Sequence, residues 1–177
     1  MSTEVKALGD FAADLAELAG LELASADREA LAAMLDQGDD GKWTNVEYTC
    51  RDAVAVTRAL AGFLLLGEDV LWTAGRQVNA RDAFHRMAEV LRAIGQSADG
   101  NLIDVGGASI KVRYANGDEG FHRLDTGRRM RFIARTVRRW SVDLVILDEA
   151  VRSQREDLLP ALAARPNPQL VTLHGLA

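Results

Sequence analysis

In the N-terminal part of the chain, apolar positions recur among polar ones at helical spacing. Between Val5 and Leu18 the apolar side chains recur every three or four residues, which predicts an amphipathic helix. These apolar positions are Leu8, Phe11, Leu15 and Leu18. A second helical stretch opens at Ser25 and places Leu31 and Leu35 on one face. The turn-rich connector QGDDGKW, residues 37–43, then ends a helical N-terminal region that we expect over residues 1–40.

Beyond the connector, short apolar runs alternate with amphipathic stretches. The apolar runs predict strands at Val46–Cys50, Val70–Ala74, Asp143–Leu147 and Leu170–Leu173. The amphipathic stretches predict helices at Asp52–Leu66, Val78–Ile94 and Gln154–Ala164. Strands and helices that alternate in this way are typical of a parallel sheet covered by helices. The expected fold class is therefore α/β, with a mostly parallel sheet, in a single domain over residues 1–177.

The middle of the chain, residues 101–134, has a different pattern. Short alternating runs are broken by Gly106-Gly107, Asn116-Gly117 and Thr126-Gly127. Asn-Gly between such runs is a hairpin signal, because both central residues of the favoured turn need a positive φ. We therefore expect a small antiparallel β insertion over residues 101–134.

Composition and charge restrict the cell compartment in which the protein is expected, but they say little about its function. The 177 residues are 48% hydrophobic and 27% charged, as in ordinary globular domains. The net charge of -5 does not predict binding to nucleic acids or membranes. One cysteine, Cys50, excludes a disulfide within the chain, and the longest apolar stretch, Ala59 to Leu66, is too short to span a bilayer. We expect a soluble cytoplasmic protein with no membrane partner.

The stretch SVDLVILDEAV, residues 141–151, carries the first sign of chemistry. Its branched apolar run ends abruptly in Asp148 and Glu149, as a buried parallel strand does when it places carboxylates at the edge of a sheet. In P-loop ATPases such a pair handles magnesium and the attacking water. Asp148 and Glu149 are therefore candidate catalytic residues, with Asp148 as the candidate Mg²⁺ ligand. The matching form of the α/β class is the three-layer sandwich of P-loop NTPases.

The sequence lacks an obvious loop to hold the phosphates. A Walker A loop needs glycines, a lysine and a hydroxyl group to bind the phosphates and Mg²⁺. GDDGKW, residues 38–43, precedes the first predicted strand and has Trp43 in place of Ser or Thr. GQSADGN, residues 95–101, follows a helix and has Asn101 at the lysine position. The segment after the first predicted strand, RDAVAVTR at residues 51–58, contains neither glycine nor lysine.

Five segments carry a family resemblance when they are taken in order. They are DDGKW, EDVLWTAGRQVNARDAFHRM, ANGDEGFHRLDTGRRMRFIAR, SVDLVILDEA and LLPALAARPNPQLVTLHG. Together they resemble the ATPase domain of the large terminase subunit of tailed double-stranded DNA phages, from roughly Gly38 to Gly175. The resemblance implies a P-loop-NTPase-like fold and the cytoplasm of a bacterial host. In an active member it also implies ATP and Mg²⁺ as cofactors.

The chain departs from this family in two respects. The family has an arginine-led phosphate loop with glycine and lysine, whereas here only Arg51 remains and Ala55 stands at the lysine position. The sequence also ends after the coupling strand, without the family's nuclease domain. Two carboxylates without a lysine would repel a triphosphate. We therefore expect a catalytically silent relative that uses no cofactor and acts by binding a terminase subunit or a host protein.

A weak or unorthodox ATPase of DNA packaging remains an alternative. In this reading, Arg51 and Arg58 replace the lysine and hold a nucleotide together with Mg²⁺. The resemblance also makes Arg135 and Arg139 candidates for an arginine finger or a phosphate contact. The sequence indicates no oligomeric state.

A DNA-binding protein is the second alternative. The basic segment Arg123–Arg139 contains seven arginines and one acid, Asp125. Arg128, Arg129 and Arg131 are the candidate DNA contacts, because arginines neutralise backbone phosphates. The same arginines could instead pair with the acids that make the chain net negative.

Overall fold

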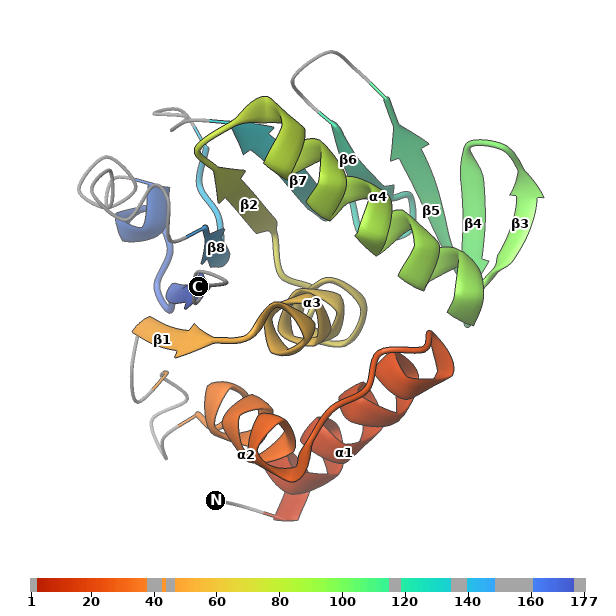
Figure 1. The fold of residues 1–177 in the computed structure, drawn as a ribbon. Coiled ribbons are helices and arrows are strands. Elements are labelled where there is room, and N and C mark those ends of the chain that lie inside the picture. The colour runs from red at the N-terminus through yellow and green to blue at the C-terminus, as the bar shows by residue number, and fades with distance from the viewer. Residues whose placement is uncertain are drawn as a thin grey trace.

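One mixed sheet organises the chain (Figure 1). The computed structural model describes residues 3–37, 43, 47–114, 119–134, 140–148 and 161–173. The helices are α1 Thr3–Leu18, α2 Ser25–Met34, α3 Asp52–Ala61, the π-helical turn η1 Gly62–Leu66 and α4 Gln77–Ile94. The strands are β1 Glu47–Cys50, β2 Val70–Ala74, β3 Gln96–Asp99, β4 Leu102–Val105, β5 Ala108–Arg113, β6 Glu119–Arg123, β7 Arg129–Ala134, β8 Leu144–Leu147 and β9 Gln169–Leu173.

Within the described residues, nine strands form one sheet in the order β1-β9-β8-β2-β7-β6-β5-β4-β3. Neighbouring strands from β1 to β7 are parallel, and neighbouring strands from β7 to β3 are antiparallel. β9 lies between β1 and β8, so the strands that precede Arg51 and Asp148 are second neighbours. The expected α/β class is confirmed. The antiparallel strands expected over residues 101–134 are present as β4 to β7; they extend the same sheet, and β3 adds one more strand before the predicted range.

Burial explains why the central strands are continuous apolar runs. All residues of β2 and β8 are buried, because a parallel sheet is covered on both faces. Strand β5 alternates instead, with Ile110 and Val112 inside and Lys111 and Arg113 exposed. The antiparallel half of the sheet therefore has one packed face and one exposed face.

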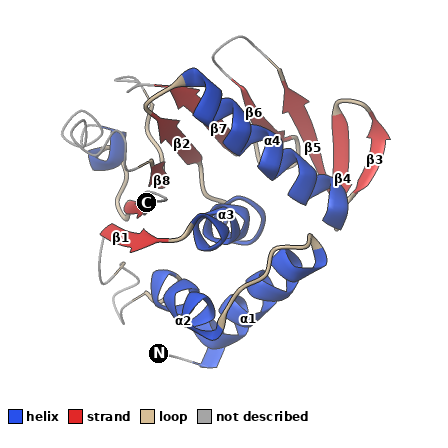
Figure 2. Cartoon of the chain, in the orientation of Figure 1, coloured by secondary structure: helices blue, strands red, loops and turns tan. Residues whose placement is uncertain are grey.

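Helices α3 and α4 cover the packed face (Figure 1 and Figure 2). α4 packs on β7, β2 and β4, while α3 contacts β8 and β9. Phe84 of α4 meets Phe121 of β6 with 5.1 Å between ring centroids, and it meets Phe132 of β7 at 5.8 Å. Trp72 of β2 stacks on Phe132 at 5.8 Å. These rings anchor α4 across the boundary between the parallel and antiparallel halves.

A smaller apolar cluster covers the opposite face of the parallel strands. Leu71, Val145 and Leu170 reach it from neighbouring strands, and Val142 and Leu162 reach it from outside the sheet. Trp140 packs at its margin. Residues 149–160, which include most of the helix predicted at 154–164, lie outside the described residues.

The first helix packs only part of the predicted apolar stripe, Leu8 and Leu15, against the core. Phe11 and Leu18 are 52% and 74% exposed. Among the described residues of α1, the buried ones are all small, namely Gly9, Ala12, Ala13 and Ala16. Small side chains permit the close approach of α1 to α2 and α3. Close packing of these small residues, with Leu8 and Leu15 beside them, therefore sets the orientation of α1.

The observed element boundaries agree closely with the predicted ones, and one predicted helix ends in a π-helical turn. β2 spans the predicted residues 70–74, and α4 begins one residue before Val78. The helix predicted at 52–66 is α3 followed by η1, and Gly67 ends it with a φ of 65°, a conformation that suits glycine. The Asn116-Gly117 turn lies outside the described residues. No helix among those described has the length and apolar character needed to cross a membrane.

Candidate functional site

The β1–α3 junction is where the family resemblance places a phosphate loop, and a single residue makes the connection. β1 ends at Cys50, α3 begins at Asp52, and Arg51 lies between them. The Ala55 amide donates to the Arg51 carbonyl at 3.1 Å and so closes the first helical turn. Val54 and Ala55 in this turn are buried in the core. The junction therefore offers a closed, buried helix start where an open loop of convergent amides would be needed.

Charged side chains already surround the N-terminus of α3. Asp52 pairs with Arg86 of α4, so a carboxylate lies where the helix dipole would attract an anionic ligand. The side chain of Arg51 is 72% exposed, and its guanidinium lies 3.6 Å from the carboxylate of Asp27 in α2. Arg51 is thus at the predicted position, on the surface, beside a carboxylate of its own chain.

Cys50 lies next to this junction as a neutral packing residue. Burial raises the pKa of its thiol to about 12, and the negative charge of Asp27 acts in the same direction. The thiolate is the reactive form of cysteine. At neutral pH the Cys50 thiol is therefore not a nucleophile.

Asp148 follows β8 directly, as the sequence predicts. Its amide donates to the Thr73 carbonyl of β2 at 3.0 Å, and Asn79 of α4 donates to its carboxylate at 3.4 Å. Because β9 separates β8 from β1, Asp148 and Arg51 follow strands that are about 10 Å apart. Both residues lie at the carboxyl edge of the parallel strands, where open α/β folds bind ligands. Glu149 lies outside the described residues.

A hollow of about 500 Å³ opens at this edge, beside α4. Its charged lining residues are Asp52, Asp82, Glu89, Asp148 and Arg86. Four carboxylates against one guanidinium give the lining a net charge of -3, so it repels a triphosphate. The described residues contain no group of three His, Cys, Asp or Glu side chains that could hold a metal ion. Magnesium bound to Asp148 would therefore need ligands from elsewhere. We call the hollow beside α4 the acidic hollow.

Arg58 lies in the core and not at the predicted nucleotide site. Its side chain is 0% exposed and forms a two-bond ion pair with Glu68, at 2.7 and 3.0 Å. Its Nε donates to the Gln169 side chain at 2.7 Å, and Gln169 in turn donates to the Met34 carbonyl at 2.8 Å. The guanidinium also lies 4.9 Å from the ring centroid of Trp43. Arg58 could reach a nucleotide only by leaving this network.

The arginines of the segment Arg123–Arg139 point in different directions. Arg123 donates to the carbonyls of Phe63 and Leu64 at 3.0 and 2.7 Å and pairs with Asp125. Its guanidinium holds the pKa of the Asp125 carboxyl below its usual range. Arg123 thus binds the last turn of the α3–η1 helix. Arg135 and Arg139 lie outside the described residues.

Arg128 belongs to a network of charges at the opposite edge of the sheet. Its Nη1 lies 3.1 Å from the carboxylate of Asp69 and 3.5 Å from that of Asp143. Arg165 approaches the same carboxylates at 2.7 and 3.5 Å. The Asp69 amide donates to Asp143 at 2.9 Å. This network joins the starts of β2, β7 and β8, so Arg128 has structural partners of its own.

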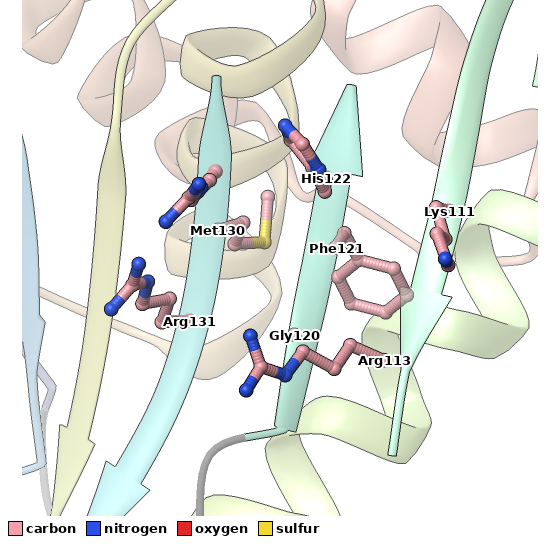
Figure 3. A pocket seen from close by; sticks show the side chains of 8 residues that line it. Lys111, Arg113, Gly120, Phe121, His122, Met130 and Arg131 are labelled. Carbon is pink, nitrogen blue, oxygen red and sulfur yellow. The ribbon is translucent and has the colours of Figure 1, made fainter. Parts of the chain in front are cut away.

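Arg129 and Arg131 lie on the exposed face of the antiparallel strands. They line a hollow together with Lys111, Arg113 and His122 (Figure 3). Lys111, Arg113 and His122 were not predicted, because they lie outside the continuous basic run Arg123–Arg139 or are not arginines. The signal that could have found Lys111 and Arg113 is the alternation of basic and apolar residues in SIKVR, residues 109–113.

Comparison with solved structures identifies the fold. The chain matches a chain from the crystal structure of the HK97 bacteriophage large terminase, with a TM-score of 0.64. The fold is terminase-like. The match covers 86% of this chain at 13% sequence identity, and it spans 33% of the terminase chain, about a third of that neighbour's length. The sequence matches no protein-family description and no curated protein.

Proposed function

We propose that this chain is a phage-derived, terminase-like domain of P-loop-NTPase ancestry that does not hydrolyse ATP and acts by binding a partner protein. The one-residue connection between β1 and α3 carries the proposal. Phosphoryl transfer depends on positioning the triphosphate with loop amides, a lysine and Mg²⁺. Here the amides belong to a closed helical turn, and no lysine is near them in the sequence.

The charge of the acidic hollow supports a protein ligand in place of a nucleotide. Its net charge of -3 disfavours an anionic triphosphate. The same charge attracts a surface that presents lysine or arginine side chains, and complementary charge of this kind speeds and orients association. A terminase subunit or a host protein with a basic surface fits this requirement.

Nucleotide binding and turnover test the silent assignment. We expect no phosphate release above background with ATP and Mg²⁺, and no increase in the melting temperature. The thermal readout is sensitive, because a ligand at a hundred times its Kd stabilises a protein by about 2.7 kcal/mol. Glu149→Gln is the control variant. Turnover that disappears in this variant would establish the ATPase alternative and refute the proposal.

A pair of charge reversals tests the protein-binding role. Asp82→Lys with Glu89→Lys changes two exposed carboxylates of the acidic hollow. Asp10→Lys with Glu29→Lys is the matched control, because it makes the same change of charge at exposed positions of α1 and α2. In co-purification from infected host cells, the first variant should lose the partner that the native chain retains, and the control should keep it. Equal retention by both variants would exclude the acidic hollow as the interface.

A further inference from the structure

Two large apolar side chains of α1 lie on the surface in line with each other. Phe11 and Leu18 are 52% and 74% exposed. They are seven positions apart, which is about two helical turns, so they lie on the same side of α1. Leu8 and Leu15 lie beside them and are partly buried against the core. We call the line of Leu8, Phe11, Leu15 and Leu18 the α1 stripe.

The spacing of the α1 stripe is that of the a and d positions of a heptad, with Leu8 and Leu15 at a and Phe11 and Leu18 at d. One helix packs against another through such a line of side chains. Apolar residues scattered singly over a surface need no partner, but these four recur along one helix. Figure 1 shows α1 at the rim of the molecule, with α2 and α3 on its inner side. The exposed part of the stripe is therefore open to a further helix.

Carboxylates border the exposed part of the α1 stripe. Asp14 lies three positions after Phe11 and four before Leu18, so it is next to both on the helix surface. The side chains of Asp14 and Glu17 are 66% and 46% exposed. Arg28 of α2 pairs with Glu17 and approaches Asp14 only to 3.9 Å. The one lysine of α1, Lys6, is five positions from Phe11 and so lies on another side of the helix. A ligand on the stripe therefore meets mainly negative charge.

We propose that the α1 stripe is a docking site for an amphipathic helix of another protein whose apolar side is bordered by lysine or arginine. Apolar side chains of the partner helix would bury Phe11 and Leu18, and a cation of the partner would pair with Asp14 between them. The proposal goes beyond the binding of a protein at the acidic hollow. It does not depend on it, because none of the residues that line the hollow belongs to α1.

A second copy of the chain fits the α1 stripe less well than a basic helix does. A two-fold contact between two α1 helices brings the same surface of both copies together. The exposed carboxylates Asp10, Asp14 and Glu17 of one copy would then lie close to those of the other. Like charges placed together in an interface disfavour it. The charge of the stripe thus selects a partner of opposite charge.

The test measures binding of the full chain to fluorescent helical peptides by anisotropy. One peptide of about three heptads has leucine at a and d and lysine at e and g, and a second peptide has glutamate in place of the lysines. The lysine peptide should bind at least about tenfold more tightly than the glutamate peptide. Phe11→Gln with Leu18→Gln should weaken binding of the lysine peptide at least about tenfold, because apolar anchors carry most of the binding energy. Asp14→Lys should narrow the difference between the peptides by about threefold or more.

The control is Val78→Gln with Leu124→Gln, which removes two apolar side chains that are 57% and 50% exposed outside α1. It should bind the lysine peptide like the native chain. Circular dichroism should show that both double variants are folded, because the changed side chains are exposed. Absent binding of the lysine peptide, equal binding of the two peptides, or equal losses in the two double variants would overturn the proposal. A dimer of the native chain in sedimentation that disappears in Phe11→Gln with Leu18→Gln would overturn the choice of a basic helix in favour of a second copy. None of these results bears on the acidic hollow.

Discussion

Removing one member of the buried pair Arg58–Glu68 is predicted to destabilise the fold strongly. The perturbation is Glu68→Ala, which removes both oxygens that bind the Arg58 guanidinium at 2.7 and 3.0 Å. Arg58 is 0% exposed, so water cannot replace the lost carboxylate without opening the core. The remaining contacts, with Gln169 and the Trp43 ring, do not neutralise the charge. The variant therefore holds an uncompensated cation in the interior.

The expected cost follows from this geometry. Removing one partner of a buried ion pair costs about 3–5 kcal/mol, a large part of the roughly 5–15 kcal/mol that stabilises an ordinary domain. With a urea m-value of about 2 kcal/mol/M, the unfolding midpoint should fall by about 2 M. The double variant Arg58→Met with Glu68→Leu should recover most of this loss, since replacing both members by apolar residues is often nearly neutral.

An exposed pair provides the control for this experiment. Arg28 and Glu17 form an ion pair with side chains 34% and 46% exposed, and Glu17→Ala should cost no more than about 1 kcal/mol. If Glu68→Ala costs no more than Glu17→Ala in urea unfolding, Arg58 reaches solvent in the native protein. Arg58 could then reach a nucleotide, as the ATPase alternative requires.

Three further predictions rest on single contacts. Gly62→Ala should destabilise the protein, because the new Cβ would collide with the Glu68 carboxylate. The Cβ added by Gly9→Ala in α1 meets only ordinary contacts, so this variant should be more stable by about 0.5–1 kcal/mol. Thermal melts of the two variants and the native chain measure both effects. Arg128→Met should lower stability by about 1 kcal/mol through loss of its carboxylate partners, and Arg129→Met, on the exposed face, should be neutral. The Cys50 thiol should resist a thiol reagent at pH 8 until the chain unfolds. Because its pKa rises from 9.0 to about 12 on folding, the native-sequence chain should lose stability relative to Cys50→Ala as the pH rises above 9, and not below it.

Local patterns in the sequence predicted the strands and the placement of Asp148. The run LVIL could be assigned to a buried parallel strand because apolar residues on both faces leave few other structures possible. A carboxylate directly after such a strand must lie at the edge of the sheet. The absence of glycine and lysine at residues 51–58 likewise predicted a junction without a phosphate loop, and α3 begins there at Asp52.

The role of Arg58 could not be predicted because its partners are remote in sequence. Gln169 is 111 positions away, and Glu68 lies ten positions on, across a π-helical turn that no spacing rule indicates. The distribution of the Arg123–Arg139 arginines over the fold could not be predicted for a related reason. In the sequence they form a single run of charge, whereas strand alternation separates Arg129 and Arg131 on the surface from Met130 in the core. Lys111 and Arg113 join them through sheet register, which the sequence does not display.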